Sequence, residues 1–319
     1  MVNVPGTEFD VRPLALGGNV FGWTADRATS FAVLDAFVDA EGSLLDTADG
    51  YSAWVPGNTG GESETIIGEW FRRSGKRDRI VLATKVATHP DFTGLAPANI
   101  AAAADASLTR LGTDHIDLYY AHFDDDTQTV PAMAQAFDAL VRAGKVRHVA
   151  LSNFSVERER EWIEFSRKEG LAVPVALQPQ YNLLHRGDVE GGYGPLAEEY
   201  HLAVFPYFSL ASGFLTGKYA TLADLEGAAR SQGIRGYLTD DAHTDAAFQV
   251  IDVARAIGES RGAAVTSVAL AWLLAKKSVT APIASARTVD QLPDLLAATE
   301  LTLTGEEIEA LDTASDIFR

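Results

Sequence analysis

The chain has 319 residues, of which 47% are hydrophobic and 22% charged, as is typical of a globular protein with a sizeable core. A formal charge of −18 disfavours a nucleic-acid-binding protein, which needs a concentrated basic face. The absence of cysteine excludes disulfides, thiolate catalysis and sulfur-based metal sites. We find no bilayer-length apolar run and no signal peptide, so we expect a cytoplasmic protein without a membrane partner.

Short strand-like segments alternate with longer segments that have the apolar spacing of helices. Residues 2–11 come first and predict a small hairpin, because Pro5-Gly6-Thr7 favours a turn. Strands are predicted at 14–17, 44–48, 80–86, 116–122, 146–152, 175–178, 204–210 and 280–284. Helices are predicted at 26–41, 63–73, 99–111, 130–143, 156–168, 195–200, 246–260, 267–275, 290–298 and from 306 onward.

This alternation predicts a parallel sheet. About eight such units in about 250 residues indicate a (β/α)₈ TIM barrel, here with an N-terminal β-hairpin and extra C-terminal helices. We expect a single domain over residues 1–319. Ser63 is expected to cap the second helix. The segment 216–244 is long, polar and glycine-bearing, which favours a lid-like loop.

Polar side chains lie at the ends of several predicted strands. Asp46 follows Leu44-Leu45 directly, and Tyr51 comes just after it. Lys85 lies near the end of the next strand, and His122 closes the one after that. Taken alone, each is more often a structural or solvated group. A buried carboxylate needs a partner, however, and the strands of a barrel end on one face, so the four side chains are expected to converge.

Seven different short motifs follow one another along the chain. Together they resemble the aldo-keto reductase family, from about residue 14 to about residue 296. The resemblance implies reversible hydride transfer between NADPH and the carbonyl of an aldehyde, ketone or sugar. The motifs are Leu44-Leu45-Asp46-Thr47-Ala48-Asp49-Gly50-Tyr51, Gly61-Glu62-Ser63-Glu64, Ala83-Thr84-Lys85, Asp117-Leu118-Tyr119-Tyr120-Ala121-His122, Gly144-Lys145-Val146-Arg147, Leu151-Ser152-Asn153-Phe154 and the segment 207–218.

The resemblance implies a catalytic tetrad of Asp46, Tyr51, Lys85 and His122. A carbonyl that accepts hydride develops negative charge on its oxygen, so a proton donor must lie within reach, and Tyr51 is the candidate. A phenol with a pKa of about 10 is a poor acid at neutral pH. Lys85 is therefore expected to lower the pKa of Tyr51, while Asp46 keeps Lys85 charged. A neutral His122 would donate to the carbonyl oxygen and orient it.

The resemblance also implies a cofactor, NADP(H), with NAD(H) as the alternative. Ser152, Asn153 and Gln178 would bind the nicotinamide carboxamide, and Tyr207 would stack on the nicotinamide ring. Glycines and backbone N–H groups of 210–218 would lie along the pyrophosphate. The residues expected to contact the cofactor are Gly18, Asn19, Val20, Asp46, Ser152, Asn153, Gln178, Tyr207, Phe208, Leu210, Ser212, Gly213, Leu215, Gly217, Lys218, Ser285, Arg287 and Gln291.

The chain departs from the family pattern at the adenosine end. Ser285 stands where many members place a lysine for the 2′-phosphate, and Leu295 replaces an asparagine. Arg287 and Gln291 resemble the alternative that other branches use, and a guanidinium can bind a phosphate bidentately. Phe208-Ser209 stands where a Ser-Pro pair is common. We expect NADP rather than NAD.

The substrate is expected to be a small carbonyl compound or alcohol. Trp23, Trp54 and Phe123 follow predicted strand ends, so they could form an apolar wall beside Tyr51 and His122. They could equally be core or lid packing. The loop 52–60 is expected to decide specificity more than the tetrad does.

Two alternatives remain, because a fold does not establish a function. The first is a regulatory cofactor-binding subunit of the same family with little turnover, which the lack of an extended N-terminal segment disfavours. The second is a metal-dependent barrel hydrolase that uses His122 and the acidic run 124–126. The other histidines show none of the usual ligand spacings, so no metal is expected. The acidic run is expected to be a solvated capping cluster.

Overall fold

A computed structural model describes residues 1–228 and 230–319. Its eight parallel strands are neighbours in chain order, except that the last strand pairs with the first. The N–H groups of Thr280 and Ile283 donate to the carbonyls of Val204 and Pro206, both at 2.9 Å, and so join the two ends of the sheet. The predicted (β/α)₈ barrel is confirmed. Its strands are β3 (Ala15–Gly17), β4 (Leu44–Asp46), β5 (Val81–Val86), β6 (Ile116–Ala121), β7 (Val146–Ser152), β8 (Ala176–Gln178), β9 (Ala203–Val204) and β10 (Ile283–Ala284).

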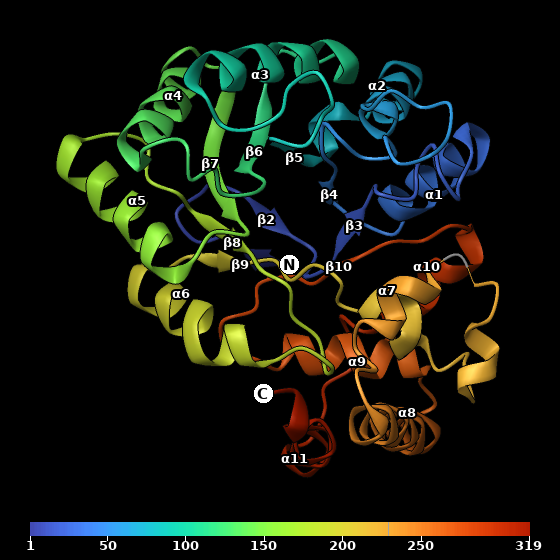
Figure 1. Ribbon diagram of the computed structural model, residues 1–319. Coiled ribbons are helices and arrows are strands. Elements are labelled where there is room, and N and C mark those ends of the chain that lie inside the picture. The colour runs from blue at the N-terminus through green and yellow to red at the C-terminus, as the bar shows by residue number, and fades with distance from the viewer. Residues whose placement is uncertain (229) are drawn as a thin grey trace.

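Helices surround the strands (Figure 1). Their apolar faces are buried against the sheet, as Met133 and Phe137 of one helix illustrate. None of the described helices is both long enough and apolar enough to cross a bilayer. The helices are α1 (Arg27–Asp39), α2 (Glu62–Ser74), α3 (Pro97–Leu111), α4 (Val130–Arg142), α5 (Val156–Glu169), α6 (Gly194–Tyr200), α7 (Ser231–Arg235), α8 (Asp241–Arg261), α9 (Val265–Leu274), α10 (Leu292–Ala297) and α11 (Gly305–Ala314).

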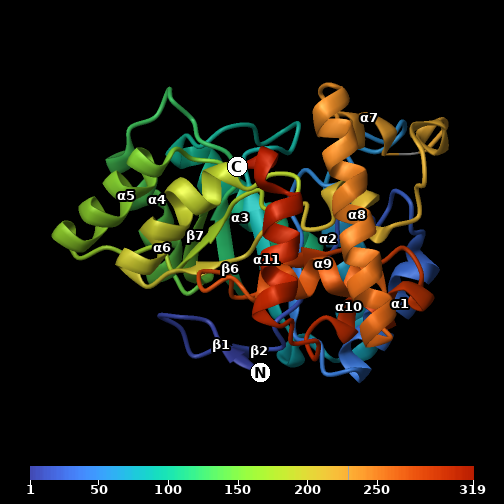
Figure 2. The same ribbon diagram turned by 90° about the horizontal axis from the view of Figure 1, so that it is seen from below.

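The predicted N-terminal hairpin is present as β1 (Val2–Asn3) and β2 (Asp10–Val11), which pair antiparallel. Figure 2 shows the hairpin at one end of the barrel and α7 at the other. Val4, Phe9 and Val11 are buried in the cluster that fills the barrel interior. The hairpin therefore covers the end from which the strands start, and the opposite end is left for chemistry.

β9 is much shorter than the predicted strand 204–210. Pro206 has no N–H to continue a ladder. Phe208 and Ala211 have positive φ angles of 50° and 46°, and a 3₁₀ helix, η3 (Ala211–Thr216), follows. Ladder hydrogen bonds continue as far as Tyr207, whose N–H donates to the carbonyl of Pro179 at 3.0 Å, and the chain turns across the end of the barrel at Phe208. The predicted strand therefore extends too far.

The segment 216–244, predicted to be a lid-like loop, contains short helices. It contains the 3₁₀ helix η4 (Leu222–Leu225), capped by the side chain of Thr221, and the short helix α7. Ile234 is completely buried. α8 begins at Asp241, earlier than predicted, because the side chain of Asp240 accepts a hydrogen bond from the N–H of His243.

The start of α2 also differs from the prediction. The capping residue is Gly61, in the left-handed region at φ 79°, and the helix begins at Glu62. Ser63 does not cap. Its hydroxyl donates to the carbonyl of Gly18 at 2.8 Å and lies 2.8 Å from the Thr47 hydroxyl. Ser63 thus ties α2 to the ends of β3 and β4.

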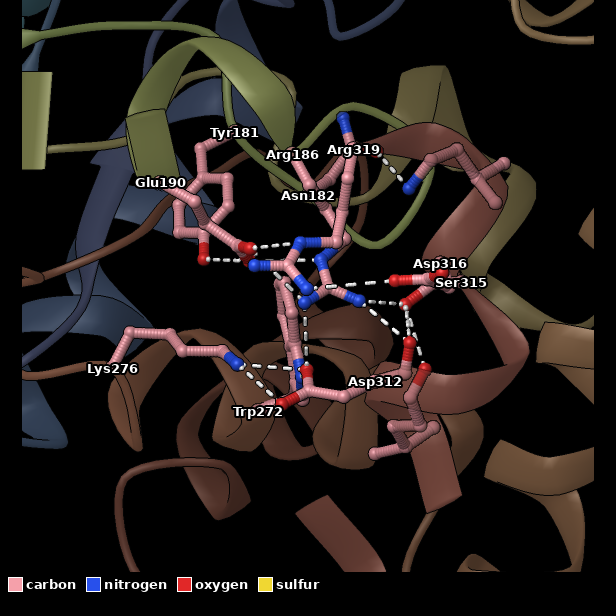
Figure 3. A network of polar contacts seen from close by, with 12 residues as sticks. Tyr181, Asn182, Arg186, Glu190, Trp272, Lys276, Asp312, Ser315, Asp316 and Arg319 are labelled. Carbon is pink, nitrogen blue, oxygen red and sulfur yellow. Dashed lines mark hydrogen bonds and ion pairs between the residues drawn. The ribbon is translucent and has the colours of Figure 1, made fainter. Parts of the chain in front are cut away.

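Arg186 fixes the C-terminal helix α11 to the barrel (Figure 3). Its guanidinium is buried and donates to Glu190 at 2.8 Å, within the π-helix η2 (Val189–Tyr193). It also donates to the carbonyl of Asp312 and the hydroxyl of Ser315, both at 2.7 Å. Lys276, just after α9, donates to the Asp312 carboxylate at 2.7 Å. Arg186 therefore joins η2 to α11, and Asp312 joins α11 to the end of α9 through Lys276.

Candidate active site

Lys85 lies at the centre of the face where the strands end. Its side chain has no exposed area, and its ammonium donates to Asp46 Oδ2 at 2.7 Å, to the Thr47 carbonyl at 2.7 Å and to Tyr51 Oη at 2.9 Å. An ammonium has three hydrogens, so these acceptors satisfy it completely. Because Tyr51 Oη accepts from Lys85, the phenol hydrogen is left to donate to another group.

The barrel register places Asp46 beside this lysine. Asp46 is opposite Gly17 of β3 and Ala83 of β5. Its Oδ2 accepts from Lys85, and its Oδ1 accepts from the side-chain amide of Gln178 at 2.9 Å. Both carboxylate oxygens are therefore occupied, which fixes the buried carboxylate in one orientation.

The electrostatics differ from the sequence-based expectation. Removal of the phenol from water and the negative charge of Asp46 raise the pKa of Tyr51 well above its ordinary value. The net shift is upward although the Lys85 ammonium lies 2.9 Å from the phenol oxygen, whereas the sequence analysis expected a lowered pKa. Burial also lowers the pKa of Lys85, against the charge of Asp46. Tyr51 is thus a protonated phenol at physiological pH.

His122 lies next to Tyr51, with 6.0 Å between ring centroids. Burial and the positive charge of Lys85 lower the pKa of His122 well below its ordinary value. The imidazole is therefore neutral at physiological pH and carries one N–H. This is the state that the sequence analysis required for a donor to a carbonyl oxygen.

Aromatic rings form a continuous wall beside these two residues. The Trp54 ring is 6.2 Å from Tyr51 and 5.6 Å from Trp23, and Phe123 is 4.8 Å from His122. Trp54 and Phe123 are 52% and 47% exposed, so they are not core residues. The residues predicted to meet substrate are thus brought together, although their role in binding remains a prediction.

The residues predicted to bind the nicotinamide form one network. The Asn153 amide donates to the carbonyl of His122 at 2.8 Å and to the Ser152 hydroxyl at 2.9 Å. Tyr207 donates to Asn153 Oδ1 at 2.7 Å, and Ser152 donates to the carbonyl of Gln178 at 2.8 Å. The network joins the ends of β7 and β8 to the turn after β9.

The residues predicted at the adenosine end form two pairs. The Ser285 hydroxyl donates to Asn19 Oδ1 at 2.6 Å, which joins the loops after β10 and β3. The N–H of Arg287 donates to Gln291 Oε1 at 2.7 Å. A Cβ on Gly17 would lie 2.5 Å from the Ser285 hydroxyl, so a glycine is needed for this approach.

Arg230 is a candidate that the sequence reasoning missed. Its guanidinium lies 5.2 Å from the Trp23 ring centroid, and no carboxylate pairs with it among residues 1–228 and 230–319. Burial and the positive charge of Arg287 lower the pKa of Arg230. The two guanidiniums therefore lie close enough to repel each other, as in a site for an anion. The sequence offered one indication of this role, because Arg230 lies within 216–244, the segment predicted to be a lid-like loop.

The segment 207–218 departs from regular structure, as expected of a backbone-lined anion site. Ser212, Gly213 and Gly217 have positive φ angles of 58°, 94° and 73°. Phe208 and Ser212 line a cavity of about 540 Å³ together with Phe318 near the C-terminus. Phe208 is 46% exposed.

Several residues predicted to touch the cofactor have restricted or exposed side chains. Those of Val20 and Leu215 are buried in the hydrophobic core, and that of Leu210 packs against it. Val20, Leu210 and Leu215 are therefore expected to contact a cofactor mainly through their backbone atoms. Lys218 is exposed, with its ammonium 4.8 Å from the Tyr219 ring. Gly18 donates its N–H to the carbonyl of Asp46 at 2.7 Å.

The acidic run after His122, predicted to be a solvated capping cluster, caps no described helix and instead holds loops and forms an ion pair, because Thr129 is the capping residue of α4. Asp125 accepts from the N–H of Leu95 at 2.8 Å and from the hydroxyl of Thr127 at 2.5 Å. Asp124 forms an ion pair with Arg158. In the part of the chain that the structure describes, no group of three histidine or carboxylate side chains could hold a metal ion.

Residues 13–316 match the model of the Aldo/keto reductase family. Norsolorinic acid reductase B of Aspergillus parasiticus is 31% identical, over 97% of this chain and 82% of its own length. The oxidoreductase YrpG of Bacillus subtilis is 36% identical, over 98% of this chain and 94% of its own length. An aryl-alcohol dehydrogenase (NADP+) of Phanerodontia chrysosporium is 28% identical, over 97% and 83%. The chain therefore belongs to the aldo/keto reductase family and is an oxidoreductase.

Proposed function

We propose that this protein reversibly reduces the carbonyl of an aldehyde, ketone or sugar with NADPH. The hydrogen bond from Lys85 to Tyr51 carries the proposal, because it leaves the phenol hydrogen available beside a neutral His122. The names of two relatives, norsolorinic acid reductase B and aryl-alcohol dehydrogenase (NADP+), support both directions of the reaction. The aromatic wall at Trp54 and Phe123 favours a substrate with an apolar body.

The tetrad would act on the carbonyl oxygen. Bound NADPH supplies the hydride. Tyr51 donates its proton as negative charge develops on that oxygen, a contribution of roughly 10²–10⁴ in rate. His122 donates its N–H to the same oxygen and orients it. When Tyr51 loses its proton, the ammonium of Lys85, 2.9 Å away, stabilises the phenolate, and Asp46 holds that ammonium in place.

The described residues fit a nicotinamide dinucleotide phosphate. Asn153, Ser152 and Gln178 would bind the carboxamide, and the Tyr207 ring would stack on the nicotinamide. Arg230 and Arg287 would neutralise phosphate. The positive charge of Arg287 contributes to the lowered pKa of the largely buried Arg230, and a phosphate bound by both guanidiniums would relieve this repulsion, so we favour NADP.

The test is the loss of NADPH absorbance with a panel of activated aldehydes. Wild type is expected to consume NADPH, whereas Tyr51→Phe should bind NADPH by fluorescence but lose at least about 10² in kcat. Tyr119→Phe is the matched control, because Tyr119 is buried in strand β6 and its hydroxyl has no partner in the described chain. Wild type that binds NADPH but consumes none would instead support the regulatory alternative.

A further inference from the structure

A buried chain of polar groups leads from Nδ1 of His122 to Asp49. The hydroxyl of Thr88 lies 3.3 Å from His122 Nδ1 and 3.1 Å from Asp49 Oδ1. Asp49 is completely buried, and its Oδ2 accepts from the N–H of Ala87 at 3.4 Å. A Cβ on Gly50 would lie 2.4 Å from the Thr88 hydroxyl, so a glycine is what lets these groups meet. The tetrad roles proposed above use neither Asp49 nor Thr88.

The hydrogens in this chain can be placed by counting donors. A threonine hydroxyl has one hydrogen, and a neutral imidazole has one N–H. When Asp49 is ionised, its carboxylate only accepts, so Thr88 donates to it. The Thr88 oxygen must then accept from Nδ1 of His122. In that state Nε2 has no hydrogen, and His122 cannot donate to a carbonyl oxygen.

Protonation of Asp49 reverses every step. The carboxylic acid donates to Thr88, Thr88 donates to Nδ1, and the imidazole hydrogen lies on Nε2, where it can meet substrate. We propose that Asp49, acting through Thr88, sets the tautomer of His122 and so switches its ability to orient a carbonyl. Asp49 is thus a positioning residue, and this role rests on the proposed carbonyl reduction.

The surroundings of Asp49 place this switch near neutrality. Burial and the negative charge of Glu64 raise the pKa of Asp49 to about 7, against the Thr88 hydroxyl, the Ala87 N–H and the charge of Arg110. Tyr51 and His122 are shifted away from neutrality, so they do not titrate there. The charged and titratable groups that face Asp49 are Glu64 of α2, Arg110 of α3, Lys85 of β5, Tyr119 of β6 and Tyr51.

The direct test is ¹⁵N NMR of histidine-labelled enzyme without substrate, from about pH 5.5 to about pH 8.5. The His122 signals are assigned from their loss in His122→Gln. In wild type we expect the imidazole hydrogen to move from Nε2 to Nδ1 as the pH rises, with a midpoint at about pH 7. Thr88→Val, which keeps the shape but removes the hydroxyl, should abolish this change, and Thr88→Ser should restore it.

Asp49→Asn should hold the hydrogen on Nε2 at every pH. The N–H of Ala87 requires an oxygen at the Oδ2 position, so the amide nitrogen faces Thr88 and donates to it. In turnover, wild-type kcat for aldehyde reduction should fall about tenfold between about pH 7 and about pH 8.5, while the Asn variant stays level. KM for NADPH should not change in either.

Two outcomes would overturn the inference. One is a His122 tautomer that does not change with pH in wild type, and the other is a change with the same midpoint in Thr88→Val. An enzyme that shows the tautomer change but never oxidises NADPH would count against the proposed function and in favour of the relay. The two failures are therefore distinguishable.

Discussion

At the scale of single residues, Asp46 holds the only buried cation of the tetrad in place, and its removal should be costly. Asp46→Asn would leave the Lys85 ammonium buried without a counter-charge. Breaking such a pair typically destabilises a protein by about 3–5 kcal/mol. Asp105→Asn breaks an exposed pair with Lys145 and should cost less than about 1 kcal/mol. Urea unfolding of both variants measures the difference, and equal costs would contradict the described geometry.

Arg287 gives a second prediction at this scale, on cofactor choice. If its guanidinium binds the 2′-phosphate, Arg287→Ala loses a charged hydrogen bond worth about 1.5–3 kcal/mol. KM for NADPH should then rise by about 10–100-fold, while KM for NADH stays the same. Steady-state kinetics with both cofactors provide the measurement and its internal control. A similar rise for NADH would place Arg287 elsewhere on the cofactor.

At the scale of elements, α5 carries a buried carboxyl group that works against folding at neutral pH. Glu159 is 1% exposed, its Oε2 has no partner in the described chain, and burial raises its pKa well above the ordinary value. The folded state therefore keeps a proton that the unfolded chain releases above a pKa of about 4.3. Its contribution to stability is greatest in acid and declines as the pH rises.

Glu159→Gln keeps the shape of the side chain and removes this titration. We expect a gain of about 1 kcal/mol or more at about pH 8, and almost none at about pH 4. Denaturant unfolding at the two pH values measures it. Glu161→Gln, on the exposed face of the same helix, is the control and should change stability little at either pH. A gain for Glu159→Gln that is independent of pH would disprove the explanation.

The attachment of α11 is a second element with a single critical side chain. Arg186→Met would leave the carboxylates of Glu190 and Asp312 without their shared buried cation. We expect a loss of about 3–5 kcal/mol, against less than about 1 kcal/mol for Arg255→Met, which breaks an exposed pair with Asp252. Thermal unfolding compares the two. Equal losses would mean that the network in Figure 3 does not anchor the helix.

At the scale of the whole molecule, the barrel and the meeting of the tetrad could be predicted from sequence for one reason. Parallel strands end on one face, so Asp46 and Lys85, each near the end of an apolar run, had to approach each other. The same rule brought His122 beside Tyr51. Helix and strand positions followed from periodicity, and their ends from glycines such as Gly112, which is left-handed at φ 61°.

Properties that depend on distant segments could not be predicted in this way. The direction of the Tyr51 pKa reflects burial and the orientation of Asp46, and neither can be read from a motif. Arg230 reaches Trp23 from a segment predicted to be a lid-like loop, and its position over that ring could not be read from the sequence. Ser63 carries the signature of a helix cap, but Gly18 and Thr47 take its hydroxyl in the folded chain. At these positions tertiary contacts determined the side-chain environment, and the local sequence pattern did not.

The central claim is that Tyr51 and its neighbours serve hydride transfer to a carbonyl. The most direct measurement follows deuterium into the alcohol product by mass spectrometry, from NADPH that carries deuterium at both C4 positions of the nicotinamide, with an aromatic aldehyde as substrate. We predict one deuterium on the former carbonyl carbon with wild type and with Tyr119→Phe, and almost none with Tyr51→Phe. Wild type that binds the labelled NADPH but leaves every aldehyde unlabelled would contradict the account.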